Sequence, residues 1–500
     1  MNGKLRVATI GLALSVAAML LLLVVRPSLD PAQLRPLPLI IGAWLAFLTA
    51  AWLLRKVPRR TAVVLILLGG IGLQAVAVSV PRAYSNDLYR YMWDGRVQAA
   101  GIDPYQYVPT ATQLTGLRNE FLFHPGARYC VSPGYVASHP AAELTAGCTR
   151  INRPTVPTIY PPAAEAYFLG VYYLHPADDS SLPIQATTAA VAVLVTVLLL
   201  VGLGRLRRDV RMAALWSWCP TVVLEAGNSA HVDVVAVAIT TAAILTLATA
   251  RTTRRTIAGG ILLGLAIATK LTPVLAVPAV FARGGDPPRP PREGMRRRWF
   301  TVAVAASGAF IAVYVPHVVR VGAKVVGFLP GYLQQENYTS GTRYGIIGLF
   351  IIGPLATVVA LLILAAVAFA VLQFSPPDRP WSGAVVMTAA ALAVATPHYQ
   401  WYSLLLVMLV ALDGRPEWLA FAAGGYYAAY PEMGRYTPPW RFDDLIAYGV
   451  PLVVVAGGWL VRHELARRAA GISEPQPATA EPVVAAVAAP AGAGAGQLTG

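Results

Sequence analysis

Apolar segments of about 20 residues, separated by short basic clusters, recur along most of the chain. A segment of this length can cross a bilayer as a helix, because a helix hydrogen-bonds its backbone internally. Of the 500 residues, 56% are hydrophobic and 13% are charged, whereas soluble domains carry about twice that charged share. The sequence therefore predicts an all-α polytopic membrane protein. It excludes a soluble enzyme, a disordered chain and a nucleic-acid-binding domain.

Basic clusters orient the predicted spans, because the cytoplasmic ends of membrane helices carry an excess of Lys and Arg. The first strong cluster lies near Arg55 and the last near Arg467. Placing every cluster inside predicts about 12–14 transmembrane helices in a plasma-membrane protein with both termini cytoplasmic. Residues 1–471 then form one membrane domain, and the Pro-, Ala- and Gly-rich residues 472–500 form a disordered cytoplasmic tail.

Two segments are too short for ordinary spans. If residues 160–175 crossed the membrane, the basic cluster near Arg205 would lie outside, so this segment is expected to re-enter the membrane or to lie on its surface. Residues 256–282 would form a hairpin of two short halves, broken at Lys270 and Pro273. Broken helices at membrane depth are tolerated where they line a cavity, which gives this hairpin a functional interpretation.

The first outer loop, residues 81–159, is far longer than an ordinary connection, and such loops are generally functional or disordered. Its start predicts a helix, one face of which carries Asp87, Arg90, Tyr91 and Asp94. Aromatic residues on the opposite face indicate an interfacial helix on the outer leaflet. The polar face has two interpretations. It is either a solvated surface with an Asp–Arg ion pair, or the location of a general base, because the apolar end of the preceding span lies beside it and would raise the pKa of a carboxylate.

Five segments of the chain carry a resemblance to a known class of membrane enzymes. In chain order they are SNDLYRYMWDGRVQAAGIDPY, RINRPTVPTIYPPAAEAYF, EAGNSAHVDVVAV, GLAIATKLTPVLAVP and TPHYQWYSLLL. Together they resemble the integral-membrane glycosyltransferases of the GT-C class, and most of all the family-87 polyprenyl-phosphate-mannose-dependent mannosyltransferases of bacteria. The resemblance runs from about residue 80 to about residue 405 and implies a GT-C-like fold.

The resemblance implies a hexosyltransferase that moves mannose from a polyprenyl-phosphate donor to a lipid or glycan acceptor hydroxyl on the extracytoplasmic face. Asp87 matches the proposed catalytic base of the family, and Asp94 matches a second acidic position. The implied partners are the lipid-linked donor, a glycolipid or glycan acceptor and the membrane, without nucleic acid. A transporter or flippase of lipid-linked sugars is the alternative function, because many spans with broken helices are also a transporter pattern. A non-catalytic subunit that binds glycolipid is a third hypothesis.

Displacement of a lipid phosphate from a sugar needs a base for the incoming hydroxyl and positive charge for the departing phosphate. Asp87 is the candidate base, and the candidates for binding the donor phosphate are Arg90, Lys270 and Arg343. Lys270 could instead snorkel to the membrane surface. Because these cations can neutralise a phosphodiester leaving group, no metal or other cofactor is expected. The chain has no Cys or His metal motif, although carboxylates and water can hold Mg²⁺ without one.

Polar residues at other predicted outer turns are candidates for contacting the sugar or the acceptor. Each has a structural alternative, such as helix capping, a fixed turn or an aromatic belt at the membrane surface. These candidates are Asn228, His231, Asp233, Tyr160, His398 and Gln400. Separately, Cys130 and Cys148 share the first outer loop, an oxidising location, and are predicted to form a disulfide. Cys219 lies within a predicted span and is expected to be a core residue.

Overall fold

The structure, a computed structural model, describes residues 36–80, 82, 85–123, 149–284, 293–429 and 441–469. Within them the regular elements are helical, apart from an isolated β-bridge between Phe123 and Thr149. The prediction of an all-α chain is therefore confirmed. By its internal contacts the chain divides into two compact units, Met1–Val455 and Ala456–Gly500. The described part of the second unit is the C-terminal portion of the last helix.

The longer helices are α2 (Pro36–Leu54), α3 (Arg59–Val78), α4 (Asp87–Ala99), α7 (Pro162–Leu174), α8 (Leu182–Arg205), α10 (Asp233–Ala248), α11 (Thr253–Thr269), α13 (Glu293–Val321), α15 (Pro354–Phe374), α16 (Pro380–Ala395), α17 (Leu404–Asp413), α18 (Ala420–Ala429) and α20 (Val450–Ala469). Short helices and helical turns connect them. These are η2 (Thr112–Leu117), η4 (Val210–Ala213), α9 (Ala214–Ser217), η5 (Val222–Asn228), η6 (Thr272–Ala276), α12 (Val277–Val280), η7 (Gly322–Val326), α14 (Leu329–Gln335), η8 (Ile347–Leu349), η9 (Gln400–Ser403), η10 (Pro416–Leu419), α19 (Arg441–Asp444) and η12 (Leu445–Gly449).

Five described helices are long and apolar enough to cross a membrane, and a sixth candidate is the pair η5 and α10, which meet at an angle of 114°. Large apolar side chains on these helices are exposed, such as Leu68 on α3 and Leu362 on α15, as expected for a lipid-facing surface. The chain is therefore a polytopic membrane protein. The five helices are Arg59–Val78, Leu182–Arg205, Glu293–Gln335, Pro354–Phe374 and Leu445–Arg468.

The number of candidate spans in this part of the chain is lower than the about 12–14 predicted from hydropathy. Several predicted spans are shorter helices: α16 has 16 residues, and α17 and α18 have 10 each. Residues 212–250, an apolar stretch long enough for two spans, contain the bent pair. Hydropathy does not separate a lipid-facing helix from an apolar helix inside the protein, and α17 is buried at every residue. The first apolar run of the sequence, residues 7–25, and the tail predicted at 472–500 lie outside the described residues.

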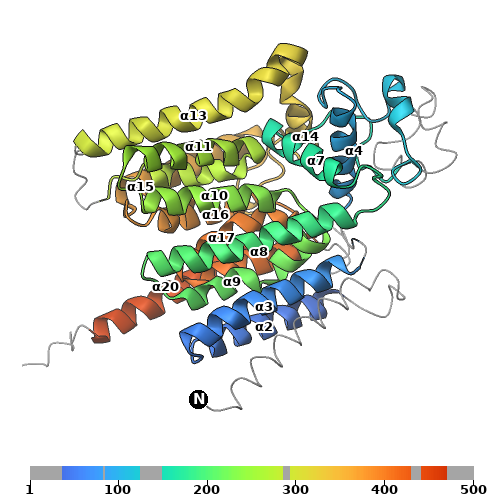
Figure 1. Ribbon diagram of the computed structural model, residues 1–500. Helices are drawn as coiled ribbons and strands as arrows, with labels where there is room; N and C mark the ends of the chain where they lie inside the picture. The colour runs from blue at the N-terminus through green and yellow to red at the C-terminus, as the bar shows by residue number, and fades with distance from the viewer. Residues whose placement is uncertain are drawn as a thin grey trace, which may run out of the picture. The chain divides into compact units, whose positions relative to one another are not determined.

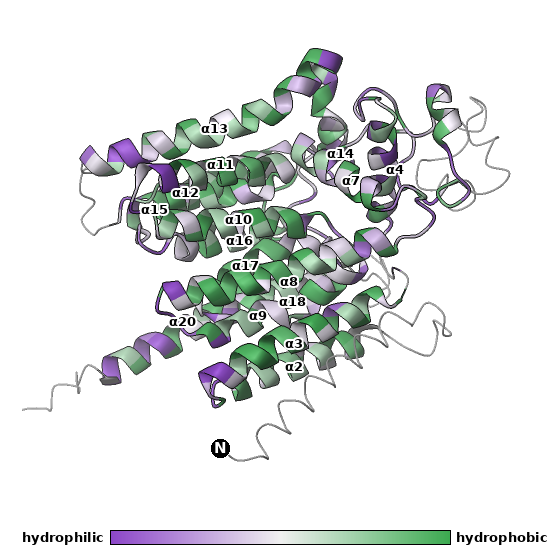
Figure 2. Cartoon of the chain, viewed as in Figure 1, coloured by the Kyte–Doolittle hydropathy of each residue, from purple (hydrophilic) through white to green (hydrophobic). Residues whose placement is uncertain are grey.

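The first unit is built from packed helices that run side by side. In Figure 1, α3, α8, α10 and α11 follow one another, and α13 lies along α11. Figure 2 shows hydrophobic residues along α3 and α8, with hydrophilic residues at helix ends and in the region of α4. The polar part of the first unit therefore gathers where the first outer loop joins the helices, and this part carries the candidate site.

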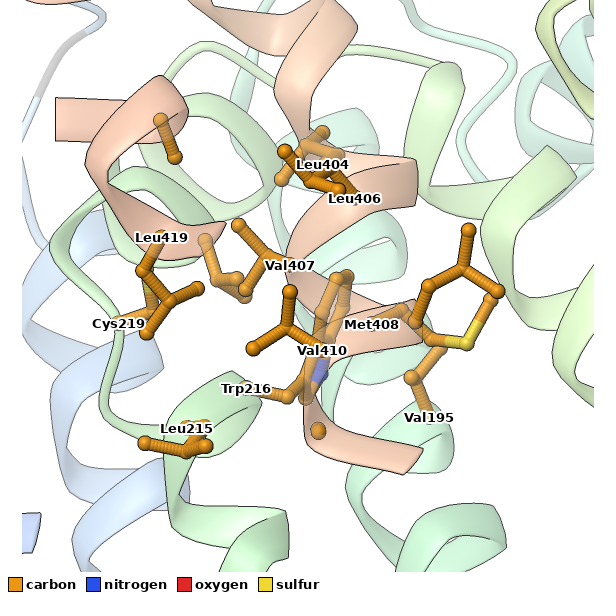
Figure 3. Close-up of a cluster of buried hydrophobic side chains, with 14 of the residues drawn as sticks. Val195, Leu215, Trp216, Cys219, Leu404, Leu406, Val407, Met408, Val410 and Leu419 are labelled. Carbon is orange, nitrogen blue, oxygen red and sulfur yellow. The ribbon is translucent and has the colours of Figure 1, made fainter. Parts of the chain in front are cut away.

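An apolar core surrounds α17. Figure 3 shows side chains of α9 and α17 turned toward one another, among them Trp216, Val407 and Met408. The Trp216 ring is fully buried, and its Nε1–H donates a hydrogen bond of 2.9 Å to the Ala192 carbonyl of α8. Cys219 is a buried free thiol in the same core, as predicted. Close packing of this kind makes this part of the first unit rigid.

Helix α4 forms where the sequence predicts a helix, but its surroundings differ from the prediction. Nine of its 13 residues are buried, so it is enclosed by protein and does not lie on a surface with one solvated face. α7 is responsible for much of this burial: Tyr91 stacks on Phe168 with ring centroids 4.4 Å apart. α7 has 13 residues and is not among the candidate spans, as expected for residues 160–175.

The close approach of α4 to α7 depends on Gly95. A Cβ atom at this position would lie 2.6 Å from the Phe168 carbonyl oxygen, so the two helices would have to separate. We expect Gly95→Ala to lower the free energy of unfolding by about 1–3 kcal/mol, as overpacking does elsewhere. The measurement is the midpoint of thermal unfolding in detergent.

Gly170→Ala on α7 is the matched control, because no atom lies within 4 Å of its would-be Cβ. This change should leave the midpoint unchanged or raise it slightly, since Ala favours the helix over Gly. Equal midpoints for the two variants would contradict the packing role of Gly95.

Candidate functional site

A cavity of about 690 Å³ lies where the start of α4, the break after α11 and α14 meet. A cavity of this size suits a sugar together with a phosphate group. Its charged lining residues are one acid, Asp87, and four bases: Arg82, Arg90, Arg153 and Lys270. The structure thus brings together four predicted site residues, Asp87, Arg90, Tyr160 and Lys270, from three separate parts of the sequence.

Asp87 is the first residue of α4, and its side chain faces the cavity. Its backbone N–H donates to the Ser85 hydroxyl at 3.2 Å, which fixes the start of the helix. The carboxylate accepts a hydrogen bond from the Asn152 side-chain amide, and the other oxygen lies 3.7 Å from His231 Nδ1. The carboxylate side chain is 15% exposed. Asp87 is therefore held in one orientation and is still accessible from the cavity.

His231 lies behind the cavity wall. It is fully buried and stacks on Trp401 at 3.9 Å, and Trp401 faces the cavity. His231 Nε2 lies 3.4 Å from a carboxylate oxygen of Glu225, which belongs to the π-helical stretch η5. Stretches of π-helix are frequent at functional sites. His231 does not line the cavity itself. It contacts two residues that do, Asp87 and Trp401.

Arg90 is buried beside the cavity. Its Nε donates to both carboxylate oxygens of Asp94 at 2.9 Å, and its Nη1 donates to the Val156 carbonyl at 3.1 Å. Its Nη2 is buried without a hydrogen-bond partner in the described residues. Asp94 does not line the cavity, and burial raises its pKa against the opposing effect of Arg90. The Asp94 carboxylate and the Val156 carbonyl therefore hold the guanidinium in place at the cavity wall.

Lys270 follows the end of α11, where the sequence predicts a break in the helix. Its Nζ lies 3.0 Å from a carboxylate oxygen of Asp233 and over the rings of Tyr160 and Tyr402, at 5.3 and 5.8 Å from their centroids. Asp233 is 3% exposed and does not line the cavity, so its carboxylate pairs with Lys270 from within the protein. The amine is held between a carboxylate and two aromatic faces, and lines the cavity.

Besides Asp94, His231 and Asp233, four predicted site residues do not line the cavity. Arg343 contacts Glu336 at 3.4 Å and His398 at 3.1 Å, and His398 contacts Asp444 at 3.2 Å. Asn228 donates to the Ala77 carbonyl at 3.0 Å and so joins η5 to α3. Gln400 is buried. Cys130 and Cys148 lie outside the described residues.

Two residues that sequence reasoning missed line the cavity beside Asp87. Asn152 bonds its carboxylate, and Arg153 has a left-handed backbone with φ of 47°. Arg153 Nε donates to Gln335 at 3.1 Å, and its Nη2 lies 3.6 Å from Glu336, so it connects the first outer loop to α14. A loop has no hydrophobic periodicity that shows which of its side chains point inward. The sequence therefore indicated these two residues only through their position in the motif RINRP.

The Lys270–Asp233 pair makes a prediction about stability. Lys270→Met leaves the Asp233 carboxylate buried without its counter-charge, and should lower the free energy of unfolding by about 3 kcal/mol. The double variant Lys270→Met/Asp233→Asn should recover more than half of that loss. Thermal unfolding of the two single variants and the double variant measures the coupling. Additive effects of the two substitutions would show that the pair is not coupled.

Two solved structures from Archaeoglobus fulgidus align with the chain at 12% identity and a TM-score of 0.36. One is the oligosaccharyltransferase AglB in complex with an inhibitory peptide and a dolichol-phosphate, and the other is an oligosaccharyltransferase tethered to an acceptor peptide. The alignments cover 81% and 80% of this chain but only 56% and 55% of those chains. No curated protein matches the sequence.

A family model matches the central part of the chain. Residues 158–397, a little under half of the chain, match glycosyltransferase family 87. The matched region contains Tyr160 and Lys270, whereas Asp87 and Arg90 precede it and Trp401 follows it. The central part of the chain is therefore similar to glycosyltransferase family 87.

Proposed function

We propose that the protein transfers a sugar, mannose, from a polyprenyl-phosphate donor to a hydroxyl of a lipid or glycan acceptor, with Asp87 as the general base. The observation that carries the proposal is the cavity itself, in which one accessible carboxylate faces Arg90 and Lys270. Catalysis of this displacement needs a base and positive charge in that arrangement. The reaction takes place on the extracytoplasmic face in this proposal, with both termini in the cytoplasm.

The proposed step is a single displacement at the anomeric carbon. The acceptor oxygen forms a bond to that carbon while its proton moves to the Asp87 carboxylate. The bond between the anomeric carbon and the phosphate oxygen breaks, and its electron pair leaves with the polyprenyl phosphate. Arg90 and Lys270 stabilise the charge that develops on the phosphate. The Asn152 amide and His231 hold the carboxylate in position for the acceptor.

The cavity wall also offers surfaces for the other parts of the two substrates. Tyr160, Tyr399 and Trp401 provide aromatic surface of the kind that sugars contact. Leu271, Phe328 and Leu329 provide apolar surface for the first units of the polyprenyl chain. Arg343 binds Glu336 and His398 away from the wall, so we assign the donor phosphate to Arg90 and Lys270. His398, Gln400 and Asn228 then support the wall without touching substrate.

Asp87→Asn tests the base assignment. We expect kcat to fall about 10²–10⁴-fold, the usual contribution of a general base, while donor binding is retained. The assay follows transfer of radiolabelled mannose from polyprenyl-phosphate-mannose to a panel of glycolipid acceptors. Asp179→Asn is the matched control, because this carboxylate is exposed and pairs with His175 outside the cavity. A variant with full activity would exclude Asp87 as the base.

We also propose that transfer needs no metal ion. Arg90 and Lys270 supply the charge that a divalent cation would otherwise supply to the leaving phosphate. In the part of the chain that the structure describes, no group of three His, Cys, Asp or Glu residues is arranged to hold a metal. Transfer should therefore continue at an unchanged rate after treatment with EDTA. Loss of activity that added Mg²⁺ or Mn²⁺ restores would overturn this proposal.

The transfer assay also separates the proposed enzyme from a transporter or flippase of lipid-linked sugars. A flippase would bind the donor and move it across a vesicle membrane without forming a glycosidic bond. Donor binding with no transfer to any acceptor in the panel would favour that alternative function.

A further inference from the structure

A chain of three side chains lies behind the proposed base and runs from Asp87 through His231 to Glu225. His231 Nδ1 lies 3.7 Å from Asp87 Oδ2, and His231 Nε2 lies 3.4 Å from Glu225 Oε2. Each nitrogen of the imidazole therefore has a carboxylate oxygen beside it. Both nitrogens are buried and make no hydrogen bond within the described part of the chain. Glu225 does not line the cavity, and the proposed transfer step gives it no role.

The backbone holds His231 close to Glu225. The π-helical stretch η5 ends just before His231, whose N–H donates to the Glu225 carbonyl at 2.9 Å. The turn between them places Ala230 in a left-handed conformation with φ of 56°, which is uncommon for a residue with a Cβ atom. Backbone strain of this kind clusters at functional sites. Trp401 stacks on the imidazole with ring centroids 3.9 Å apart, so the ring has little freedom to move.

The two carboxylates differ in how they are stabilised. Glu225 is 3% exposed, and His231 is its basic partner among the described residues. The Tyr426 hydroxyl donates to Glu225 Oε1 at 3.0 Å, which leaves Oε2 for the imidazole. Asp87 is partly exposed to the cavity and accepts from the Asn152 amide. A buried carboxylate needs hydrogen bonds more than an accessible one does, so the single proton of a neutral imidazole is more stabilising on Nε2.

We propose that Glu225 is a positioning residue for the base: it holds the imidazole proton on Nε2, so that Nδ1 of His231 faces Asp87 as a hydrogen-bond acceptor. Two acceptors do not bond to each other, which agrees with the separation of 3.7 Å.

The contact becomes a hydrogen bond during transfer. The O–H bond of the acceptor hydroxyl breaks, its proton binds Asp87 Oδ2, and the new O–H donates to His231 Nδ1. Because this bond forms only as the proton arrives, it stabilises the transition state more than the bound substrates. The role of Glu225 rests on the proposed function, with Asp87 as the base.

Glu225→Gln tests this role. Tyr426 keeps the amide oxygen on its own side, so the amide nitrogen lies beside His231 Nε2 and donates to it. The imidazole proton then moves to Nδ1, which can no longer accept from Asp87; a wrong tautomer of this kind disables other acid–imidazole pairs. We expect kcat to fall about 10–100-fold, the effect of losing one hydrogen bond to a reacting group. The donor and acceptor KM should stay within about twofold, because Glu225 touches neither substrate.

Two further variants test the same role without an amide. Glu225→Met removes the acceptor for Nε2–H, and His231→Phe keeps a ring against Trp401 but removes both nitrogens. Each should lower kcat by a similar factor in the mannose-transfer assay, with purified full-length protein in detergent. The midpoint of thermal unfolding identifies the variants that fold, and the role is judged on those.

A double substitution separates the proposed role from a general loss of packing. In the Asp87→Asn background, Glu225→Gln should change the residual rate by less than about twofold, because the base through which it acts is already absent. Asp103→Asn is the matched control: Asp103 is also a buried carboxylate paired with a histidine, His317 at 2.8 Å, and neither residue lines the cavity. This control should transfer mannose at the wild-type rate.

Three results would overturn the role of Glu225 while leaving the proposed function intact. They are an unchanged or raised kcat in Glu225→Gln and Glu225→Met, a loss that appears in KM and not in kcat, and a loss that multiplies with that of Asp87→Asn. A raised kcat would mean that His231 is a cation that already donates to Asp87 before the proton arrives. If the wild-type protein transfers no mannose, or if Asp87→Asn is fully active, the proposed function fails, and the role of Glu225 fails with it.

Discussion

The outer part of this protein is organised around a guanidinium that is buried and must be neutralised. Arg90 is 4% exposed, and a charge removed from water is costly unless it is paired and hydrogen-bonded. Asp94 provides the counter-charge one helical turn away, at 2.9 Å. Arg90 Nη1 donates to the Val156 carbonyl, which ties the end of the first outer loop to α4, the helix near its start. α7 and the end of the loop therefore enclose α4 and bury the ion pair. The cavity lies beside the start of α4, where this enclosure is incomplete.

The same rule applies to two other cations of the cavity wall. Lys270 is supported by Asp233, and Arg153 by Glu336, in each case by a carboxylate that does not itself line the cavity. These carboxylates hold the cations in place and reduce the cost of burying them. Asp87 is the acid that lines the cavity, at the N-terminal end of α4. A base facing fixed cations is the arrangement that a displacement at a sugar carbon requires.

Local features of the candidate site could be predicted from the sequence. The spacing of Asp87, Arg90 and Asp94 predicts one helical face, and all three lie on α4. The two short halves around Lys270 predict a broken helix, and α11 ends immediately before it. Arg343 and His398 could not be placed in the same way. Both were expected near the donor or the acceptor, but they contact each other, and their direction depends on packing against Glu336 and Asp444.

The sequence by itself determined that the chain is helical and membrane-embedded, because the length and apolarity of a segment limit the backbone structures that lipid allows. It also determined which local segments carry charge, since helical spacing is a property of neighbouring residues. Only the tertiary structure decided which apolar helices are buried, as α17 is, and which cations line the cavity. It also brought Asn152 and Arg153 beside Asp87. These contacts are between residues far apart in the chain. They depend on tertiary packing, which a local sequence pattern does not predict.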